Sequence, residues 1–258
     1  MTCLTAAERL LQELGITEPE EIDLEAIAWH VGATVKVKAL DGCEARVIGA
    51  GNRAIITVNE NSAPVRRRFS IGHEIGHWSN HRGRKFVCRS DEIGSHGNGG
   101  IYLERQADAF AADLLLPGYI LLPYISQFKA LTFDVIRQVA GIFKTSMPAT
   151  AIRLVEKGFW PSILLCHSQS GRRWFVSSPS VSRDWFPRSD LDPASYAFEL
   201  VFGRASSQAK PRTVKANAWF ERRDAERYEL QEQSLRMTDG DTLSLLLISD
   251  RRMLVGHI

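Results

Sequence analysis

Apolar residues near the start of the chain recur at helical spacing. Between Leu4 and Leu14 they follow three- and four-residue steps, with charged and polar residues between them, and Gly15 comes next. This pattern predicts an amphipathic helix that ends at a glycine able to adopt a left-handed conformation. The pattern of residues 23–32 predicts a second helix that ends at another glycine. Alternation over residues 33–40 and 46–59 then predicts three strands, the last two forming a hairpin that turns at residues 49–52.

Two longer helices follow the predicted strands. The first starts near Ser62, with Pro64 tolerated in its first turn, and the second covers IYLERQADAFAADLLL until Pro117 ends it. Glycine and polar residues dominate the stretch between them, Gly83 to Gly100, which we predict to be largely loop. Residues 1–123 therefore read as one mixed unit of helices and a small sheet.

Two further units are predicted after this point. Residues 124–160 show helical periodicity on both sides of a break at residues 144–146, with Ser146 as N-cap and Pro148 in the next turn, a spacing that suits a helix-turn-helix. In residues 161–258 strand-like alternation dominates. We predict a hairpin turning at residues 168–172, a helix capped by Asp192, and strands in 213–220, 227–237 and 241–249, the last two joined at Asp239–Gly240. The fold class is thus α+β, with a small α+β C-terminal domain as a candidate regulatory part.

Composition and charge are those of a globular protein. The hydrophobic fraction is 44% and the charged fraction 24%, so disorder is not expected, and a formal net charge of +2 does not by itself indicate a nucleic-acid or membrane partner. The four cysteines form no CxxC pair, which argues against a zinc ribbon and a disulfide framework. No segment approaches the ~20 apolar residues of a membrane span. We therefore expect a cytoplasmic protein with reduced thiols and no membrane partner.

The first long helix carries the motif HEIGH. His73 and His77 are four residues apart, so they share one helix face, where two imidazoles can bind one divalent ion. Glu74 follows the first histidine and is placed to take a proton from a metal-bound water. The alternative is a run of polar residues on a solvated face. Apolar neighbours such as Ile75 and Trp78 indicate a mostly buried helix instead, where such groups need partners.

A catalytic metal needs a third protein ligand and an open fourth position. The second long helix offers Glu104 as that ligand, and Asp108, on the same face, as an acceptor for a ligand histidine. Alternatively, these acids lie there only because the positive end of the helix dipole stabilises negative charge in the first turn. This alternative explains Glu104 better than Asp108. Two histidines and one carboxylate around zinc, with Glu74 as general base, predict peptide hydrolysis.

Other histidines are less suited to this site. His81 continues the four-residue series, but it lies about 12 Å along the helix axis from His73 and cannot share an ion with it. We predict that His81 caps the end of its helix. His30, His96 and Tyr102 are considered as donors to a developing oxyanion, and a structural or exposed role is favoured for each.

Taken together, these motifs resemble those of the ImmA/IrrE metallopeptidases. RRRFSIGHEIGHWSNH followed by ERQADAFAADLLLP carries the resemblance, which extends over roughly residues 5–155. It implies a thermolysin-like minimal metallopeptidase core followed by a helix-turn-helix region. It also implies His73, His77 and Glu104 as ligands of Zn²⁺ or Mn²⁺, with Glu74 as the catalytic residue. The implied substrate is a helix-turn-helix repressor of the Xre type, whose cleavage would derepress stress-response or mobile-element genes. Some longer relatives end in a GAF-like sensor domain, for which the tail here is short.

Two other functions compete with proteolysis. The chain could be a DNA-binding regulator with a structural metal site, or a regulator whose tail senses a ligand. The predicted second helix of the helix-turn-helix, MPATAIRLVEK, offers Arg153 and Lys157 and little else to read bases, which argues against direct DNA binding.

Overall fold

A computed structural model describes residues 4–80, 86–89, 101–203, 210–238 and 240–255. The chain divides into two compact units, residues 1–127 with 139–149 and residues 128–138 with 150–258. The α+β fold class is confirmed. The predicted three-part division into residues 1–123, 124–160 and 161–258 stays a prediction.

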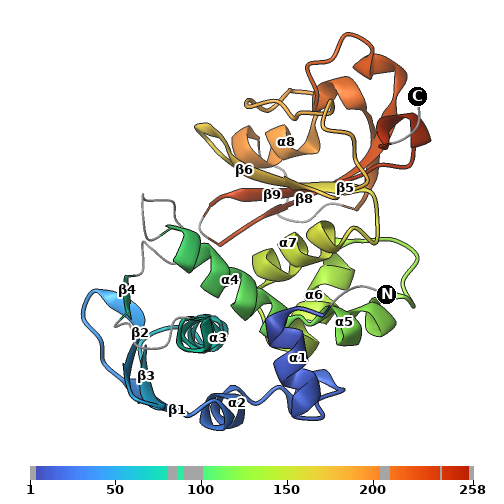
Figure 1. The fold of residues 1–258 in the computed structure, drawn as a ribbon. Coiled ribbons are helices and arrows are strands. Elements are labelled where there is room, and N and C mark those ends of the chain that lie inside the picture. Colours follow the sequence, from blue (N-terminus) through green and yellow to red (C-terminus); the bar gives the residue numbers. More distant parts are fainter. Residues whose placement is uncertain (1–3, 81–85, 90–100, 204–209, 239, 256–258) are drawn as a thin grey trace. The chain divides into compact units, whose positions relative to one another are not determined.

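The first unit contains a four-stranded sheet in the order β1-β3-β2-β4 (Figure 1). β1 and β3 are parallel and the other pairs antiparallel, with strands at Ala33–Lys38, Cys43–Ala50, Arg53–Asn59 and Phe86–Arg89. The predicted β2–β3 hairpin is confirmed, and Gly51 takes a positive φ of 57° at its turn. β4 lies in the stretch predicted as largely loop. Its four residues are too few to show a period, and pairing with β2 defines the strand.

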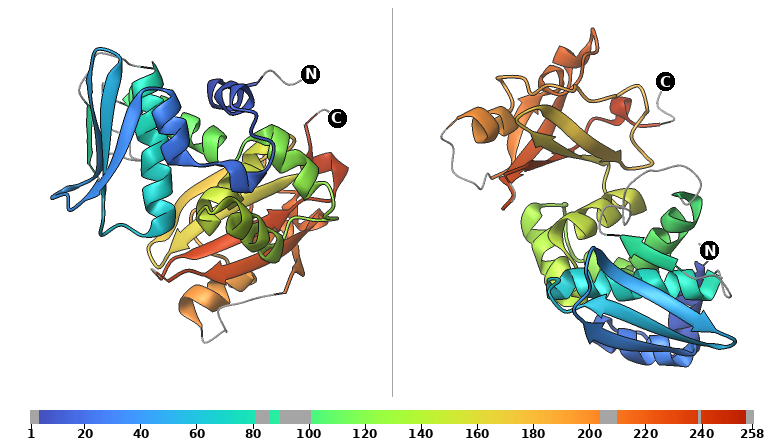
Figure 2. Two further views of the ribbon diagram at one scale, coloured as in Figure 1. Left: turned by 90° about the horizontal axis from the view of Figure 1, so that it is seen from below. Right: turned by 90° about the vertical axis from the view of Figure 1, so that its left-hand side faces the viewer.

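Helices pack on this sheet and on one another. α3 lies along one face of the sheet (Figure 2), and α4 packs against α3. The long helices begin and end close to the predicted positions, and Gly15 and Gly32 adopt positive φ where the first two helices stop. The α-helices of this unit and of the segment that follows it are α1 Ala6–Glu13, α2 Leu24–His30, α3 Pro64–Asn80, α4 Ile101–Leu115, α5 Gly118–Ile125, α6 Phe133–Phe143 and α7 Met147–Lys157.

The turn between α6 and α7 follows the predicted pattern. Lys144 adopts a positive φ of 53°, and the Ser146 hydroxyl accepts a hydrogen bond from the backbone N–H of Ala149 at 3.3 Å. The predicted helix, short turn and helix are therefore confirmed. Within the described residues no single helix is long and apolar enough to cross a membrane, although the bent pair α4–α5 reaches that length and composition.

The second unit contains a five-stranded antiparallel sheet in the order β6-β5-β9-β8-β7. Its strands are β5 Ser162–Ser168, β6 Gly171–Ser177, β7 Arg212–Lys215, β8 Glu229–Arg236 and β9 Thr242–Leu247. The helix α8, Tyr196–Phe202, also belongs to this unit. The predicted hairpin at residues 168–172 and the last two strands are confirmed. Gly240 adopts a positive φ at the predicted β8–β9 turn, whereas Asp239 lies outside the described residues.

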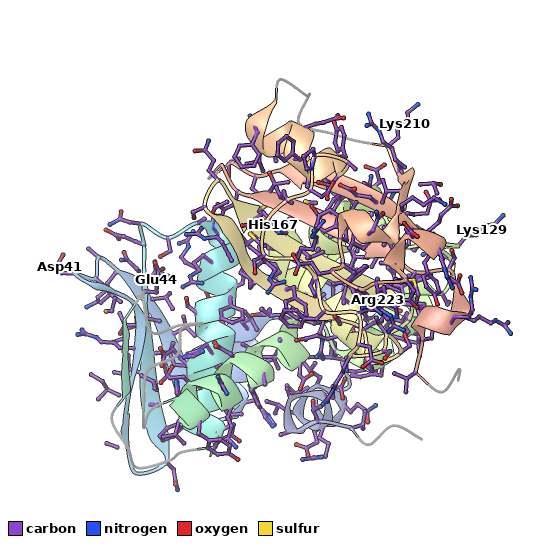
Figure 3. The ribbon with its side chains drawn as sticks, turned by 90° about the horizontal axis from the view of Figure 1, so that it is seen from above. Asp41, Glu44, Lys129, His167, Lys210 and Arg223 are labelled. Atoms are coloured by element: carbon purple, nitrogen blue, oxygen red, sulfur yellow. The ribbon has the colours of Figure 1, made fainter. Side chains whose placement is uncertain are left out.

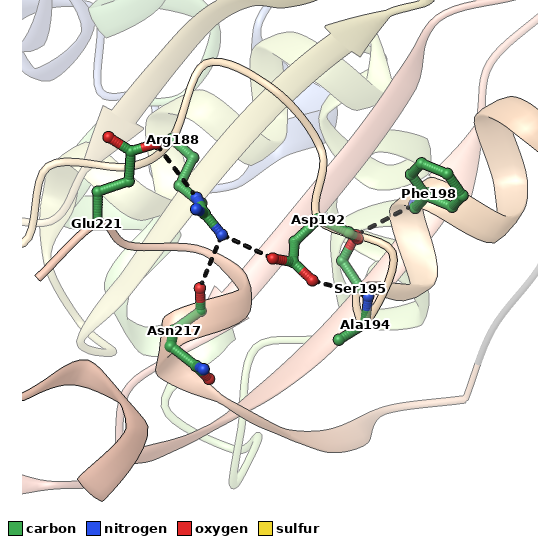
Figure 4. A network of polar contacts seen from close by, with 7 residues as sticks. All are labelled: Arg188, Asp192, Ala194, Ser195, Phe198, Asn217 and Glu221. Carbon is green, nitrogen blue, oxygen red and sulfur yellow. Dashed lines mark hydrogen bonds and ion pairs between the residues drawn. The ribbon is translucent and has the colours of Figure 1, made fainter.

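Two predictions in this unit are wrong in detail. Residues 213–220 do not form one strand, because the chain turns into a 3₁₀ segment at Ala216–Ala218 and the Trp219 indole donates to buried Glu232 at 3.0 Å. The N-cap of α8 is Ser195 rather than Asp192 (Figure 4). Asp192 instead accepts from the Ala194 backbone and pairs with an arginine, so the helix begins later.

His167 is a buried histidine on β5 of this unit (Figure 3). Its ring contacts that of Trp219 at 5.8 Å between centroids, and neither ring nitrogen has a hydrogen-bond partner within the described part of the chain. Burial, together with the positive charge of Arg172, lowers the pKa of His167 to about 4, against a smaller opposing effect of Asp190. The folded protein therefore holds this ring neutral.

Candidate metal centre

Close contact between α3 and α4 creates the site. Gly72 faces Ala111 and Gly76 faces Ala107, so no side chain separates the two backbones at these positions. A Cβ atom on Gly76 would lie 3.2 Å from the Cα of Ala107, closer than ordinary packing allows. Small residues on both helices thus let the polar faces next to this seam meet.

Trp78 fixes α3 against the rest of the first unit. Its side chain is 2% exposed, its indole N–H donates to the carbonyl of Val31 at 2.8 Å, and its ring occupies the space beside Gly49 on β2. A Cβ on Gly49 would overlap the Trp78 ring. Because Trp78 directly follows His77, this contact also holds the end of the histidine motif in place.

Three predicted ligands converge on one point. The Nε2 atoms of His73 and His77 lie 3.0 Å apart, and the Glu104 carboxylate lies 3.1 Å from the first and 3.2 Å from the second. Tetrahedral zinc with bonds of about 2.0–2.2 Å would place its ligand atoms about 3.3–3.6 Å apart. Two imidazoles and one carboxylate at this spacing therefore fit a divalent cation.

Asp108 contacts one of these histidines. Its Oδ1 atom lies 2.9 Å from Nδ1 of His73. If Nδ1 carries the proton and donates a hydrogen bond to Asp108, the lone pair of Nε2 points into the cluster, as a metal ligand requires. The structure therefore places Asp108 behind His73, on the side of the ring away from Glu104.

The electrostatics of the cluster favour a positive charge. Burial lowers the pKa of His73, but hydrogen bonds to Asp108 and Glu104 and the charge of Glu74 outweigh it and raise this pKa to about 9. Burial raises the pKa of Glu104, whereas hydrogen bonds from His73 and His77 outweigh it and lower this pKa to about 2. Three carboxylates, those of Glu74, Glu104 and Asp108, thus act on His73, and a divalent ion at the cluster would offset their negative charge.

Glu74 is fully buried beside this cluster. It follows His73 in α3, and its side chain is 0% exposed. Its charge contributes to the raised pKa of His73. The structure therefore places Glu74 inside the protein and within electrostatic reach of His73.

The remaining predicted residues differ in where they lie. His81 and His96 fall outside the described residues, His30 is exposed at the end of α2, and Tyr102 is 70% exposed at the start of α4. Phe69 was given no functional role from the sequence. The centroid of its ring lies 6.3 Å from that of His73. Its position four residues before His73, on the same helix face, is the sequence signal that predicts this closeness.

One protein family matches the part of the chain that contains the cluster. The family model described as IrrE N-terminal-like domain, Peptidase M78, matches residues 30–155. These residues belong to the ImmA/IrrE family of metallopeptidases. The matched stretch contains the His-His-Glu cluster, α6 and all but the last two residues of α7.

One solved structure shares the fold of this chain over most of its length. It is described as a Mycobacterium tuberculosis transcriptional regulator, with a TM-score of 0.63, 15% sequence identity, and coverage of 94% of this chain and 74% of that one. At this identity the likeness concerns the fold alone. No curated protein matches the chain.

Proposed function

We propose that this protein is a metal-dependent endopeptidase that cleaves a helix-turn-helix repressor of the Xre type and so derepresses the genes it controls. The observation that carries the proposal is the convergence of His73, His77 and Glu104 next to buried Glu74. Membership of residues 30–155 in a metallopeptidase family supports the same reaction class. Two ligands come from α3 and one from α4. Three protein ligands around a tetrahedral ion would leave a fourth coordination position for water or substrate.

In this proposal His73, His77 and Glu104 hold Zn²⁺ or Mn²⁺, and Asp108 keeps His73 in the ligand tautomer through its 2.9 Å contact with Nδ1. An ion held there would supply Lewis-acid polarisation and would make water a better nucleophile at neutral pH. Glu74 accepts the proton of the attacking water and passes it to the leaving amine.

The repressor is proposed as substrate on narrower grounds. The fold neighbour is described as a transcriptional regulator, and α6 and α7 carry the spacing of a helix-turn-helix. In this proposal α7 does not read DNA, because Thr150, Ala151, Leu154 and Val155 are buried within the protein and few of its side chains remain for contacts with bases. We also propose that the second unit regulates the first.

Glu74→Gln tests the peptidase proposal. Glutamine keeps the size of the side chain but cannot accept the proton, so we expect unchanged metal content and at least about 10²-fold slower cleavage. The assay incubates purified protein, loaded with Zn²⁺ or Mn²⁺, with the product of a neighbouring gene for a helix-turn-helix repressor. Fragments are followed by gel electrophoresis and mass spectrometry, and bound metal by elemental analysis.

Glu25→Gln on α2 is the matched control, because it makes the same chemical change at an exposed glutamate. Full activity of Glu74→Gln would remove the catalytic role of Glu74. Full activity after removal of all metal by a chelator would refute metal dependence. Salt-dependent binding of the purified protein to an operator, without cleavage, would favour the DNA-binding alternative.

A further inference from the structure

A groove with a volume of about 610 Å³ lies at one end of the four-stranded sheet, in the first unit. Its walls come from the end of α2, the start of β1 and the hairpin between β2 and β3. Trp29, Thr34, Ile48, Arg53 and Ile55 contribute the larger side chains of the lining. We call this groove the Trp29 groove.

The Trp29 groove belongs to the face of the sheet that points away from α3. Ile55 is exposed although both of its neighbours in β3 are buried, and Ile48 is its cross-strand partner on β2, so both side chains lie on this outer face. α3 packs on the inner face, where Trp78 occupies the space beside Gly49. The sheet therefore separates the Trp29 groove from the metal ligands on α3.

Three large apolar side chains are exposed together in this groove. Trp29 is 73% exposed, Ile48 48% and Ile55 42%. Apolar residues scattered singly over a surface are ordinary, whereas a group of them marks an interaction site. Tryptophan is also among the residues that contribute most to binding at protein interfaces. The group therefore predicts a partner that covers it.

Positive charges flank the apolar group on both sides. Arg53 lines the groove, and Lys36 and Arg46 are both cross-strand partners of one residue of β3, about 7 Å along the strand from Ile55. Within residues 4–80 and the other described ranges, none of these three cations forms an ion pair. Glu44, the acidic residue of β2, already accepts a hydrogen bond from a serine hydroxyl. The outer face therefore complements a partner that carries negative charge.

The chemistry of the groove favours a protein over a nucleic acid. Branched aliphatic side chains offer no flat surface on which bases stack, and stacking on aromatic rings is what sites for single strands use. An amphipathic helix, by contrast, is a common cover for an apolar sheet face, as α3 is on the inner face. Its apolar residues recur at three- and four-residue steps and can contact neighbouring side chains of the groove together.

We propose that the Trp29 groove binds an acidic amphipathic helix of a protein partner. The apolar residues of this helix contact Trp29, Ile48 and Ile55, and its carboxylates pair with Arg53 and with the two cations of the next row. Since the groove and the metal centre lie on opposite faces of the sheet, this inference does not rest on the proposed peptidase function.

The test measures binding of synthetic helical peptides to the full chain by fluorescence anisotropy. In the first probe leucine recurs every fourth residue and glutamate fills the neighbouring positions. A second probe has lysine in place of each glutamate, and a third has serine in place of each leucine. We expect the glutamate–leucine probe to bind at least about tenfold more tightly than either of the others.

Two substitutions separate the apolar and the charged contributions. Trp29→Ala should weaken the glutamate–leucine probe by about tenfold or more. Arg53→Glu should weaken the same probe by about threefold to tenfold and should strengthen the lysine probe, because the charge it meets is reversed. Both residues are exposed, so the urea midpoint should stay at the wild-type value.

Two matched controls make the same changes elsewhere in the first unit. Leu122→Ala removes an exposed apolar side chain from α5, and Arg9→Glu reverses an exposed charge on α1. Neither residue lines the groove, and both variants should bind the glutamate–leucine probe as the wild-type protein does.

The outcomes decide between the possible occupants. Wild-type preference for the glutamate–leucine probe, lost in Trp29→Ala, shifted toward lysine in Arg53→Glu and kept in both controls, supports the proposal. Equal binding of all three probes, or affinities unchanged by both groove substitutions, would overturn it. Displacement of the probe by a duplex oligonucleotide of equal or higher affinity would assign the groove to nucleic acid instead. A dimer in sedimentation that Trp29→Ala dissociates would assign it to a second copy of the chain.

Discussion

Gly76 tests whether close helix contact builds the metal centre. Gly76 precedes His77 in α3, and a Cβ atom there would lie 3.1 Å from the Cβ of Phe110 and 3.2 Å from the Cα of Ala107. One turn earlier, a Cβ on Gly72 would lie 3.4 Å from the Cβ of Ala111, at the border of ordinary contact. The two glycines therefore form a matched pair for the same substitution to alanine.

The two substitutions should differ in sign. Replacing glycine by alanine inside a helix stabilises it by about 0.8–1.0 kcal/mol. Overpacking a close seam costs about 1–3 kcal/mol. For Gly76→Ala the backbone of Ala107 cannot move aside without moving α4, so the cost exceeds the gain and we expect net destabilisation of about 1 kcal/mol. For Gly72→Ala the contact is mild, and we expect a change between zero and about 1 kcal/mol of stabilisation.

Urea unfolding, followed by tryptophan fluorescence, measures both changes in the free energy of unfolding. Metal affinity, measured by competition with a chelating dye, provides the second readout. Gly76→Ala should weaken metal binding, because it pushes the helix of Glu104 away from His77, whereas Gly72→Ala should preserve it. Equal stabilisation by both substitutions, with equal metal affinity, would refute the argument that the seam sets the ligand distance.

Two further predictions concern single side chains. Asp108→Ala should weaken metal affinity by about 10–100-fold in the dye assay, because His73 loses its hydrogen-bond partner at Nδ1. Asp108→Asn keeps an acceptor and should weaken metal affinity less. Equal metal affinities of the wild-type protein and both variants would contradict the orienting role of Asp108. Folding stability should decrease as the pH is lowered from about 6.5, the pKa of a histidine in the unfolded chain, to about 4, the pKa of His167 in the folded protein. In this range only the unfolded chain binds the proton. His167→Phe, which keeps a ring beside Trp219, should flatten this part of the urea-midpoint profile, and an unchanged profile would show that other groups cause it.

The ligand set could be predicted from sequence because it depends on local helix geometry. His73 and His77, and likewise Glu104 and Asp108, are four residues apart, and a helix of 3.6 residues per turn places each pair on one face. Only the meeting of the two helices is a long-range event. The small residues of the second helix, such as Ala107, already indicated close approach, and the structure adds that glycines of α3 face them.

Features that depend on distant partners could not be predicted in the same way. β4 has four residues and is defined by its pairing with β2 rather than by its own periodicity. The helix cap at Ser195 depends on Asp192 being occupied by Arg188 and by the Ala194 backbone, which a local N-cap rule does not include. The shortened β7 depends on Trp219 reaching Glu232 on another strand.

α4 presents two neighbouring strips to α3, and this arrangement joins stability to chemistry. Ala107 and Ala111 form the strip that contacts the glycines, whereas Glu104 and Asp108 form the strip that faces the two histidines. Because both strips belong to one rigid helix, any change in the separation of the helix axes also changes the distance from carboxylate to imidazole. Glycine in α3 therefore serves close approach rather than backbone freedom. We therefore expect substitutions on the exposed faces of α3 and α4 to be tolerated far better than substitutions where the glycines of α3 contact the alanines of α4. These small residues set the distance between the ligands although none of them is a ligand.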